Sequence, residues 1–428
     1  MTIQSSATPR DQALREPWTA PLASQGCRPE VQRVASRVLA GERIDATEAL
    51  LLHEQADLAT LGRLADAVRR RLHPEQRVTY IVDRNINPTN ACITDCGFCA
   101  FYRRPDDPEA YVLSREELYQ KIQETADLDG RQILIQGGHH PYLKTDWWCE
   151  LIADIRERFE TINPHALSAP EIDHLSKLDK RPVEEVIADL VAAGMGSVPG
   201  AGAEMLVERV RLIIAPKKTT TDRWLDVHRK IHEAGLRSSA TMMFGHVETA
   251  AERVEHLMRL RDLQDETGGF TAFACWNMQP EGVPEEHIYP KKTTPAIYLR
   301  VQALSRIVLD NFQNIQTSYV TQGTRMAQAS LRYGCNDFGG TMIEENVVSA
   351  AGCFNLESIQ TIEHAIERAG FVPRQRNSWY GIVDERHGEA DGPRGPASRE
   401  EAATHRAAPD RAPTSTGSST ETSTGGHA

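Results

Sequence analysis

The sequence lacks two features that would assign it to large classes of protein. Its 428 residues contain no apolar run near the roughly 20 residues that cross a membrane as a helix. The N-terminus also lacks the basic-then-apolar pattern of a secretory signal. Positive charge is not in excess, because 60 acidic residues against 48 basic ones give a net charge of -12. Nucleic-acid recognition needs a concentrated basic patch. We therefore expect a cytoplasmic protein that has no membrane span and binds no nucleic acid.

Regularly spaced cysteine pairs are absent as well. Of the 8 cysteines, three lie in one short window and the others are scattered one at a time. A disulfide framework would need a paired pattern, whereas a compact set suits a metal site in a reducing compartment. The scattered cysteines show no second cluster spacing. They are Cys27, Cys149, Cys275, Cys335 and Cys353.

The chain divides into four segments by composition. Residues 1–30 are polar and irregular, and residues 383–428 are a mixture of Gly, Ser, Thr, Pro and Ala, so we expect both ends to be disordered. Residues 31–77 have apolar positions at helical spacing and predict a helical extension. Residues 78–382 alternate short apolar runs with longer amphipathic stretches, which is typical of repeated βα units.

Eight strands are predicted within residues 78–382, and a polar or glycine-rich stretch follows each of them. We therefore expect an α/β fold, a (β/α)8 barrel of the TIM type, whose active site forms where the strands end. A partial six-strand barrel and an open sheet are the alternatives. The predicted strands lie at Val78–Ile86, Gln132–Ile135, His165–Ser168, Ser197–Val198, Arg237–Met243, Phe270–Ala274, Ile315–Tyr319 and Asp337–Gly340.

Three cysteines follow the first predicted strand with the spacing Cys-x3-Cys-x2-Cys: Cys92, Cys96 and Cys99. Three thiolates on one short loop can hold three corners of a cubane iron–sulfur cluster and leave the fourth iron open. A zinc site is the alternative, with His139 or His140 as an added ligand, although structural zinc generally has four closed ligands.

The segment Cys-Ile-Thr-Asp-Cys-Gly-Phe-Cys resembles the signature of the radical S-adenosylmethionine (SAM) superfamily. The resemblance implies a 4Fe-4S cluster held by the three cysteines, with SAM on the open iron, and it places Phe98 beside the SAM adenine. Gly137 and Gly138 end the second predicted strand, where missing side chains expose the backbone to a ligand. Their position resembles the segment that holds the SAM amino group in the superfamily.

Two carboxylates also follow predicted strands. Glu171 and Glu204 could accept hydrogen bonds from the ribose hydroxyls or the ammonium of SAM. The alternative for each is a carboxylate that stabilises the start of a helix.

Further candidates are charged or titratable side chains near the predicted barrel mouth. Arg209 and Arg211, with Lys217 and Lys218 as neighbours, could bind a substrate carboxylate, although such charges often only cover helices. We expect His246 and Glu345 to carry protons in catalysis.

Residues from about 50 to 380 resemble the cyclic dehypoxanthinyl futalosine synthase family of menaquinone biosynthesis. The resemblance implies a radical SAM oxidoreductase of the futalosine pathway. It would remove the C4' hydrogen of the ribose of dehypoxanthine futalosine and join that carbon to the benzoate ring, giving cyclic dehypoxanthine futalosine. The segments that carry the resemblance are 79–87, 99–103, 240–249, 264–273 and 336–352.

The resemblance leaves other members of the superfamily as alternatives. They are aminofutalosine synthase and the deazaflavin-forming radical SAM synthases, which share the cluster loop and the barrel. A non-catalytic iron–sulfur electron carrier is a further alternative, although a carrier would normally close all the ligands of its cluster. We expect a one-electron donor such as flavodoxin or ferredoxin as a partner, and a homodimer.

Overall fold

The computed structural model describes residues 28–285, 288 and 293–383. The two ends predicted to be disordered lie outside the described residues, apart from 28–30 and 383. At the inner edge of the first, Pro29 and Glu30 already belong to a helix. No helix of the described part is long and apolar enough to cross a membrane.

The described residues contain one 10-stranded sheet in which all strand pairs are parallel. The spatial order is β10-β1-β9-β8-β7-β6-β5-β4-β3-β2. The strands are β1 (Arg77–Ile81), β2 (Asp83–Ile86), β3 (Gln132–Ile135), β4 (Asn163–Ala166), β5 (Ser197–Val198), β6 (Arg237–Phe244), β7 (Phe270–Asn277), β8 (Asn314–Gln316), β9 (Asp337–Gly340) and β10 (Val372–Gln375).

The sheet closes because β1 and β2 are two halves of one stretch of chain, separated only by Val82. The first half pairs with β9 and the second with β3. The chain after β9 continues along β2, since the backbone N–H of Ile343 donates to the carbonyl of Asp83 at 3.1 Å. The predicted (β/α)8 barrel is thus confirmed, with the first predicted strand divided in two. The sequence did not predict β10, which pairs with the free side of β1.

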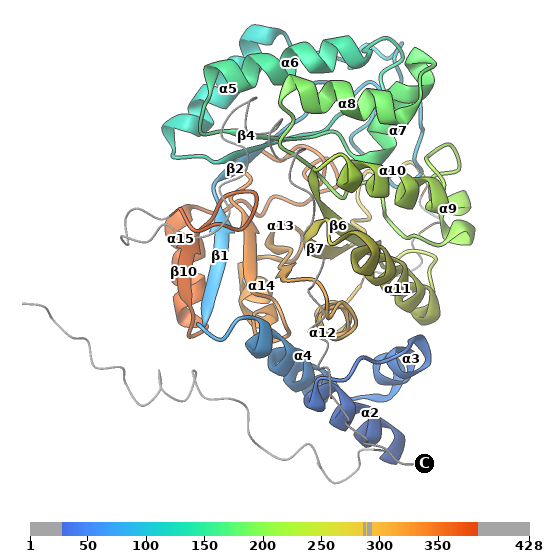
Figure 1. The fold of residues 1–428 in the computed structure, drawn as a ribbon, viewed down its shortest axis with the longest axis vertical. Coiled ribbons are helices and arrows are strands. Elements are labelled where there is room, and N and C mark those ends of the chain that lie inside the picture. Colours follow the sequence, from blue (N-terminus) through green and yellow to red (C-terminus); the bar gives the residue numbers. More distant parts are fainter. Residues whose placement is uncertain (1–27, 286–287, 289–292, 384–428) are drawn as a thin grey trace, which may run out of the picture.

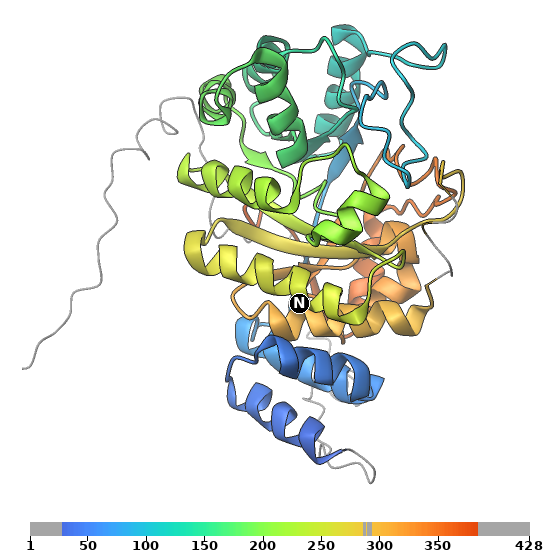
Figure 2. The ribbon, with the colours of Figure 1, turned by 90° about the vertical axis from the view of Figure 1, so that its right-hand side faces the viewer.

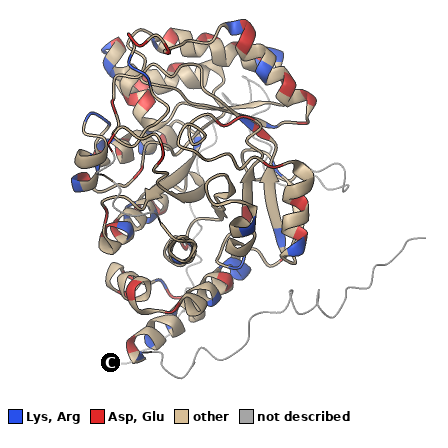
Figure 3. Ribbon diagram, turned by 180° about the vertical axis from the view of Figure 1, so that it is seen from behind, with Lys and Arg blue, Asp and Glu red and all other residues tan. Residues whose placement is uncertain are grey.

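Helices cover the outside of the sheet (Figure 1), and the charged residues lie mainly on these helices and on the loops (Figure 3). The capping boxes expected of Ser and Thr followed three residues later by Glu are present at Ser114 and Thr249. The helices after β2 are α5 (Arg115–Asp127), α6 (Thr145–Arg158), α7 (Ala169–Asp179), α8 (Val183–Ala193), α9 (Glu208–Ile214), α10 (Thr221–Glu233), α11 (Ala250–Thr267), α12 (Pro295–Val308), α13 (Tyr319–Gln322), α14 (Thr324–Ser330) and α15 (Ile359–Arg368).

The N-terminal extension consists of α2 (Pro29–Ala40), α3 (Ala46–Gln55) and α4 (Leu58–Leu72). α3 and α4 lie against α11 and α12 on the outside of the barrel, and α2 packs on α3 and α4 (Figure 2). Polar contacts reinforce the packing. Arg43 pairs with Asp265 at 2.5 Å and with Asp310 at 2.8 Å, and Arg300 donates to the His53 carbonyl at 2.7 Å.

The base of the barrel interior is formed by residues 376–380, which follow β10. Arg376 is buried and pairs with Asp337 at the start of β9, with contacts of 2.6 and 3.1 Å. Ser378 accepts a hydrogen bond of 2.8 Å from Asn163 at the start of β4. The segment therefore links strands on both sides of the barrel at their amino ends.

Several histidines are buried in the packed layers between sheet and helices. Burial lowers the pKa of His53 to about 4, and that of His256, which is fully buried, to about 3. Above pH 6.5 such a histidine is neutral in both the folded and the unfolded chain. Below pH 6.5 the unfolded chain takes up protons that the folded chain does not, so the folded state loses stability as the pH falls.

We predict that the free energy of unfolding falls by about 2 kcal/mol per fully buried histidine between pH 6.5 and pH 5. Urea denaturation followed by circular dichroism at each pH measures this. In a His256→Gln variant the decrease in the free energy of unfolding should be smaller by the contribution of one histidine, about 2 kcal/mol. An equal loss in wild type and variant would contradict the assignment for His256.

Candidate active site

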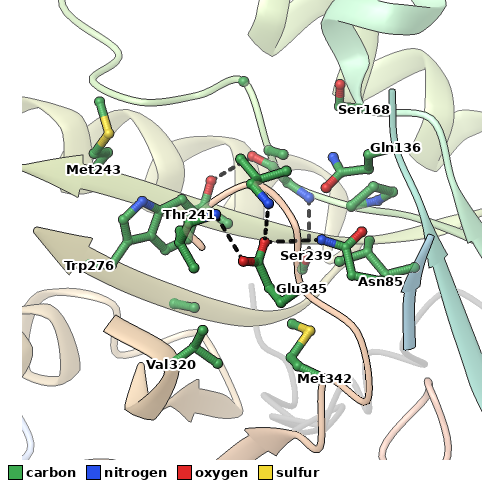
Figure 4. A pocket seen from close by; sticks show the side chains of 18 of the residues that line it. Asn85, Gln136, Ser168, Ser239, Thr241, Met243, Trp276, Val320, Met342 and Glu345 are labelled. Carbon is green, nitrogen blue, oxygen red and sulfur yellow. Dashed lines mark hydrogen bonds between the residues drawn. The ribbon is translucent and has the colours of Figure 1, made fainter. Parts of the chain in front are cut away.

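A cavity of about 430 Å³ opens at the carboxyl ends of the strands and extends down to Arg376 and Tyr380 at the base. Its two sides differ in chemistry (Figure 4). Asn85, Gln136 and Ser168 lie on one side, while Met243, Trp276 and Val320 lie across from them. Most of the residues singled out in the sequence line this cavity. They are Cys92, Cys96, Phe98, Cys99, Gly137, Gly138, Glu171, Glu204 and Glu345.

The cysteine loop leaves β2 and folds back over the cavity. Backbone hydrogen bonds fix its course: Cys92 donates to Arg103 at 2.8 Å, Gly97 to Ile214 at 2.9 Å and Cys99 to Cys96 at 3.1 Å. Cys92 and Cys96 are buried, with 9% and 8% of their surface exposed. The loop therefore holds the thiols at the edge of the cavity, shielded from solvent.

The surroundings of the thiols match an iron–sulfur cluster better than a single metal ion. The backbone N–H groups of Thr94 and His139 point at the Cys92 sulfur at 3.4 and 3.3 Å, as they do around cluster sulfurs. In the described part of the chain, no three His, Cys, Asp or Glu side chains converge as they would on one metal ion. Cysteines on different corners of a cubane need no such convergence. The geometry therefore disfavours the zinc alternative.

Cys96 and Cys99 need a metal to become thiolates at neutral pH. Burial raises the pKa of Cys96 to about 12 and also raises that of Cys99, where backbone N–H groups oppose the effect of burial. A thiol with such a pKa stays protonated at neutral pH unless the positive charge of a metal displaces the proton. The donor set thus fits a cationic cluster.

Two glycines beside the cysteine loop allow the loops to approach closely. A Cβ on Gly138 would lie 2.1 Å from the Ala91 carbonyl oxygen and 2.9 Å from the Cys92 Cβ. The Gly137 N–H donates to Glu171 at 2.9 Å. Gly138 therefore leaves room for the cysteine loop, and Glu171 holds the glycine segment in place.

Glu171 serves two structural contacts at once. Its second oxygen accepts from the backbone N–H and hydroxyl of Ser168, at 2.7 and 2.6 Å, and so completes the capping box of α7. Burial raises its pKa, and these hydrogen bonds oppose the rise. Glu171 therefore stabilises the start of α7, as the alternative interpretation predicted, and it also lies in the cavity wall.

Glu204 and Lys218 form an ion pair in the cavity wall. The Lys218 Nζ lies 2.8 Å from the Glu204 carboxylate and 5.5 Å from the centre of the Phe98 ring. Burial lowers the pKa of Lys218, but the charge of Glu204 and the hydrogen bond to it oppose burial, and the pKa is raised overall. Lys218 therefore remains cationic beside the cysteine loop.

Arg209 and Arg211 do not reach the cavity, and nor does their neighbour Lys217, which pairs with Asp95 at 2.7 Å. Arg209 has a half-exposed side chain that pairs with Glu252 at 2.6 Å on the surface. Arg211 is buried and donates to the backbone carbonyls of Gly202 and Thr219, which fixes the loop after β5. Both arginines are committed to the protein and neither faces a ligand.

His246 is buried beside the end of β6 and does not line the cavity. Its Nε2 donates to the Met243 carbonyl and its Nδ1 accepts from the Val247 N–H, both at 2.9 Å. Burial lowers its pKa, with Glu248 opposing the effect. Both ring nitrogens are therefore occupied in holding the turn after β6.

Glu345 does line the cavity, but its carboxylate is fully engaged (Figure 4). One oxygen accepts from Asn85 at 3.3 Å and from Val347 at 3.0 Å, and the other from Val348 and Ser349 at 2.8 and 3.2 Å. Burial raises its pKa and the backbone N–H groups oppose the rise. Glu345 anchors the loop over the cavity.

The lower half of the cavity contains residues that the sequence did not single out. Asp83, Asn85 and Asn87 alternate along β2 and the residue after it, and all three line the cavity. Polar residues at a spacing of two along a strand mark one face. That alternation in the sequence could have identified the three residues. No sequence pattern could have identified Arg376, because it follows a strand that was not predicted.

The comparisons with known proteins agree with this geometry. Residues 86–260 match the radical SAM superfamily, and residues 267–387 match the family described as the CofH/MqnC C-terminal region. The chain is 42% identical to cyclic dehypoxanthine futalosine synthase of Halalkalibacterium halodurans over 353 residues. The aligned region covers 82% of this chain and 95% of that protein.

The chain belongs to the cyclic dehypoxanthine futalosine synthase family. The chain is also similar over most of its length to proteins named for other functions. Aminodeoxyfutalosine synthase of Thermus thermophilus is 38% identical over 83% of this chain and 96% of its own. The crystal structure of HydG, a maturase of the [FeFe]-hydrogenase, has a TM-score of 0.66 at 15% identity, covering 91% of this chain and 82% of that one. This last likeness concerns the fold alone.

As a radical SAM enzyme, a futalosine synthase of this family uses a 4Fe-4S cluster and SAM. The residues of the cavity fit both groups. The cysteine loop supplies three sulfur donors with N–H groups directed at Cys92. Beside it, the Glu204–Lys218 pair offers one anionic and one cationic group to an amino acid's ammonium and carboxylate.

We predict that a Gly138→Ala variant loses most of its bound iron, because the added methyl group would displace the cysteine loop. Iron content and visible absorbance after anaerobic reconstitution measure the loss. Glu116→Ala is the control, since Glu116 is an exposed residue in the first turn of α5 and does not line the cavity. An iron content equal to wild type in Gly138→Ala would contradict the close packing described here.

Proposed function

We propose that this protein cyclises dehypoxanthine futalosine to cyclic dehypoxanthine futalosine. The observation that carries the proposal is the 42% identity to a cyclic dehypoxanthine futalosine synthase over 95% of that protein. The cavity offers a polar side for a sugar and an apolar side for an aromatic ring, which is the combination that this substrate requires.

The cluster and SAM, when bound, supply a carbon-centred radical that removes the C4' hydrogen of the substrate's ribose. Cys92, Cys96 and Cys99 hold the cluster. Gly137, Gly138 and Glu204 hold SAM, and Phe98 packs against its adenine. Support for these roles comes from contacts in the cavity wall: Gly138 packs against Cys92, and Lys218 lies near both Glu204 and Phe98.

The protein's own contribution is to orient the substrate and to keep water out. Ribose hydroxyls bind the polar side through Asn85, Gln136 and Ser168, and the benzoate ring packs against Trp276 and Val320. Two fixed faces hold the ribose carbon and the ring close to each other, and such positioning is a large part of catalysis in a ring closure. Burial protects the intermediate from solvent.

The reaction also needs an electron source. We propose a one-electron donor such as flavodoxin or ferredoxin and a cytoplasmic location, because the free thiols of the cluster loop require a reducing compartment. We also propose a homodimer, which is common among barrel enzymes.

We predict that the cluster-reconstituted protein, incubated anaerobically with dehypoxanthine futalosine, SAM and a strong reductant, yields a product lighter by two hydrogens. 5'-Deoxyadenosine and methionine should appear with it, and mass spectrometry measures all three. A Cys96→Ala variant should form none of them, because cluster binding fails.

Two other results would redirect the assignment. SAM cleavage with an untouched substrate would keep the superfamily and exclude this reaction, and an enolpyruvyl benzoate substrate would then test aminodeoxyfutalosine synthesis. No SAM consumption by protein with an intact cluster would exclude a radical SAM activity.

A further inference from the structure

We infer that Asp83 is the catalytic base that accepts the proton released when the benzoate ring regains aromaticity. The inference rests on the proposed function. Once the ribose carbon has joined the ring, the ring carbon at the new bond still carries its hydrogen. That C–H bond must break, with the proton going to a base and one electron to a one-electron acceptor of the iron–sulfur class. The product then has two hydrogens fewer than the substrate.

Asp83 has the position that this role requires. It is the first residue of β2, is 2% exposed and lines the cavity. Asn85 and Asn87 follow it on the same face, toward the cysteine loop. The carboxylate reaches across to β9, because a Cβ on Gly340 would lie 2.1 Å from one of its oxygens. Asp83 therefore lies deeper in the cavity than the cofactor residues, where the substrate has to be.

Four carboxylates line the cavity within the described residues, and Asp83 is the one that is neither paired with a cation nor bound by three or more hydrogen bonds. An ionised carboxylate has about four acceptor positions. Glu345 accepts four hydrogen bonds and Glu171 three, while Glu204 is paired with Lys218.

Asp83 accepts only two hydrogen bonds, one on each oxygen. They come from the Met342 N–H at 3.0 Å and from the Gln132 side chain at 3.2 Å. Each oxygen therefore keeps a free lone pair. The two contacts hold the carboxylate in one orientation without saturating it.

The charges around Asp83 suit a base that works near neutral pH. Burial raises its pKa to about 6, while Met342, Arg376 and Gln132 lower it and Asp337 raises it again. Tyr319 on α13 also faces this carboxylate, and its own pKa is raised. A carboxylate with such a pKa is ionised at pH 7 and is a stronger base than an exposed aspartate.

The histidines of the cavity wall are weaker candidates. Burial lowers the pKa of His165 to about 3, and its Nδ1 already contacts the Ser197 hydroxyl at 2.7 Å. His139 is bound to Thr94 at 2.9 Å and stacks on His174. Asp83 combines basicity near neutral pH with a free acceptor position, and neither histidine has both properties.

The test compares wild type with Asp83→Asn and Asp83→Glu, each reconstituted and saturated with SAM and dehypoxanthine futalosine. In wild type, product formation should rise as the pH increases through about 6 and then level off, because Asp83 must be ionised. Asp83→Asn should form about 100-fold less product with no such rise, which is the usual contribution of a general base. It should still form 5'-deoxyadenosine, so the ratio of product to 5'-deoxyadenosine falls. Asp83→Glu should restore part of the rate and the pH dependence.

An independent readout uses the same reconstituted proteins without substrate. The infrared spectrum of wild type should contain a carboxylic acid C=O band that disappears between pH 5 and 7 and is missing in Asp83→Asn. Gln132→Leu removes one hydrogen bond to the carboxylate and should move the midpoint to higher pH. This variant tests the inference even if Asp83→Asn does not fold.

Three results would overturn the inference. The first is product formation by Asp83→Asn at the wild-type rate and pH dependence. The second is a carboxylic acid band in wild type that Asp83→Asn retains, or a midpoint that Gln132→Leu leaves unchanged. The third is the absence of product from wild type, and that result alone would also overturn the proposed function.

Discussion

The architecture depends on one stretch of backbone that pairs with the strands on both sides of it and so closes the sheet. Residues from Arg77 to Ile86 pair with β9 in their first half and with β3 in their second, and the change occurs at Val82. Without this double pairing the parallel sheet would stay open, and its inner face would be exposed to solvent. The same stretch leads directly into the cysteine loop, so barrel closure also positions the metal-binding thiols.

A second constraint is electrostatic. The interior of the barrel contains carboxylates and cations far from water, where an unpaired charge is costly. Two of these carboxylates are paired with cations: Glu204 with Lys218 beside the cysteine loop, and Asp337 with Arg376 at the base. Each pair leaves the space between them nearly neutral. The wall and base of the cavity can therefore contain charged groups without an uncompensated charge at either pair.

Sequence reasoning recovered the features that local patterns specify. Cluster spacing, strand alternation and the residues directly after strands predicted the barrel and most of the cavity wall. It failed where contacts between distant segments decide the outcome. His246 follows a strand, as an active-site residue should, but hydrogen bonds to its own turn direct the ring away from the cavity. Arg376 lies in the cavity because of Asp337, and no local pattern around residue 376 predicts a partner so far away in the chain.

The contact between Asp83 and Gly340 also constrains how this chain can change during evolution. The carboxylate occupies the volume that any side chain at position 340 would need, with an oxygen 2.1 Å from the Cβ site. A residue larger than glycine at 340 therefore requires the Asp83 carboxylate to move or to be replaced. The two positions lie on neighbouring segments of the barrel wall although they are far apart in sequence, and the constraint acts in one direction. Homologues with a larger residue at 340 should lack the aspartate at 83 or turn its side chain elsewhere, whereas glycine at 340 is compatible with any residue at 83.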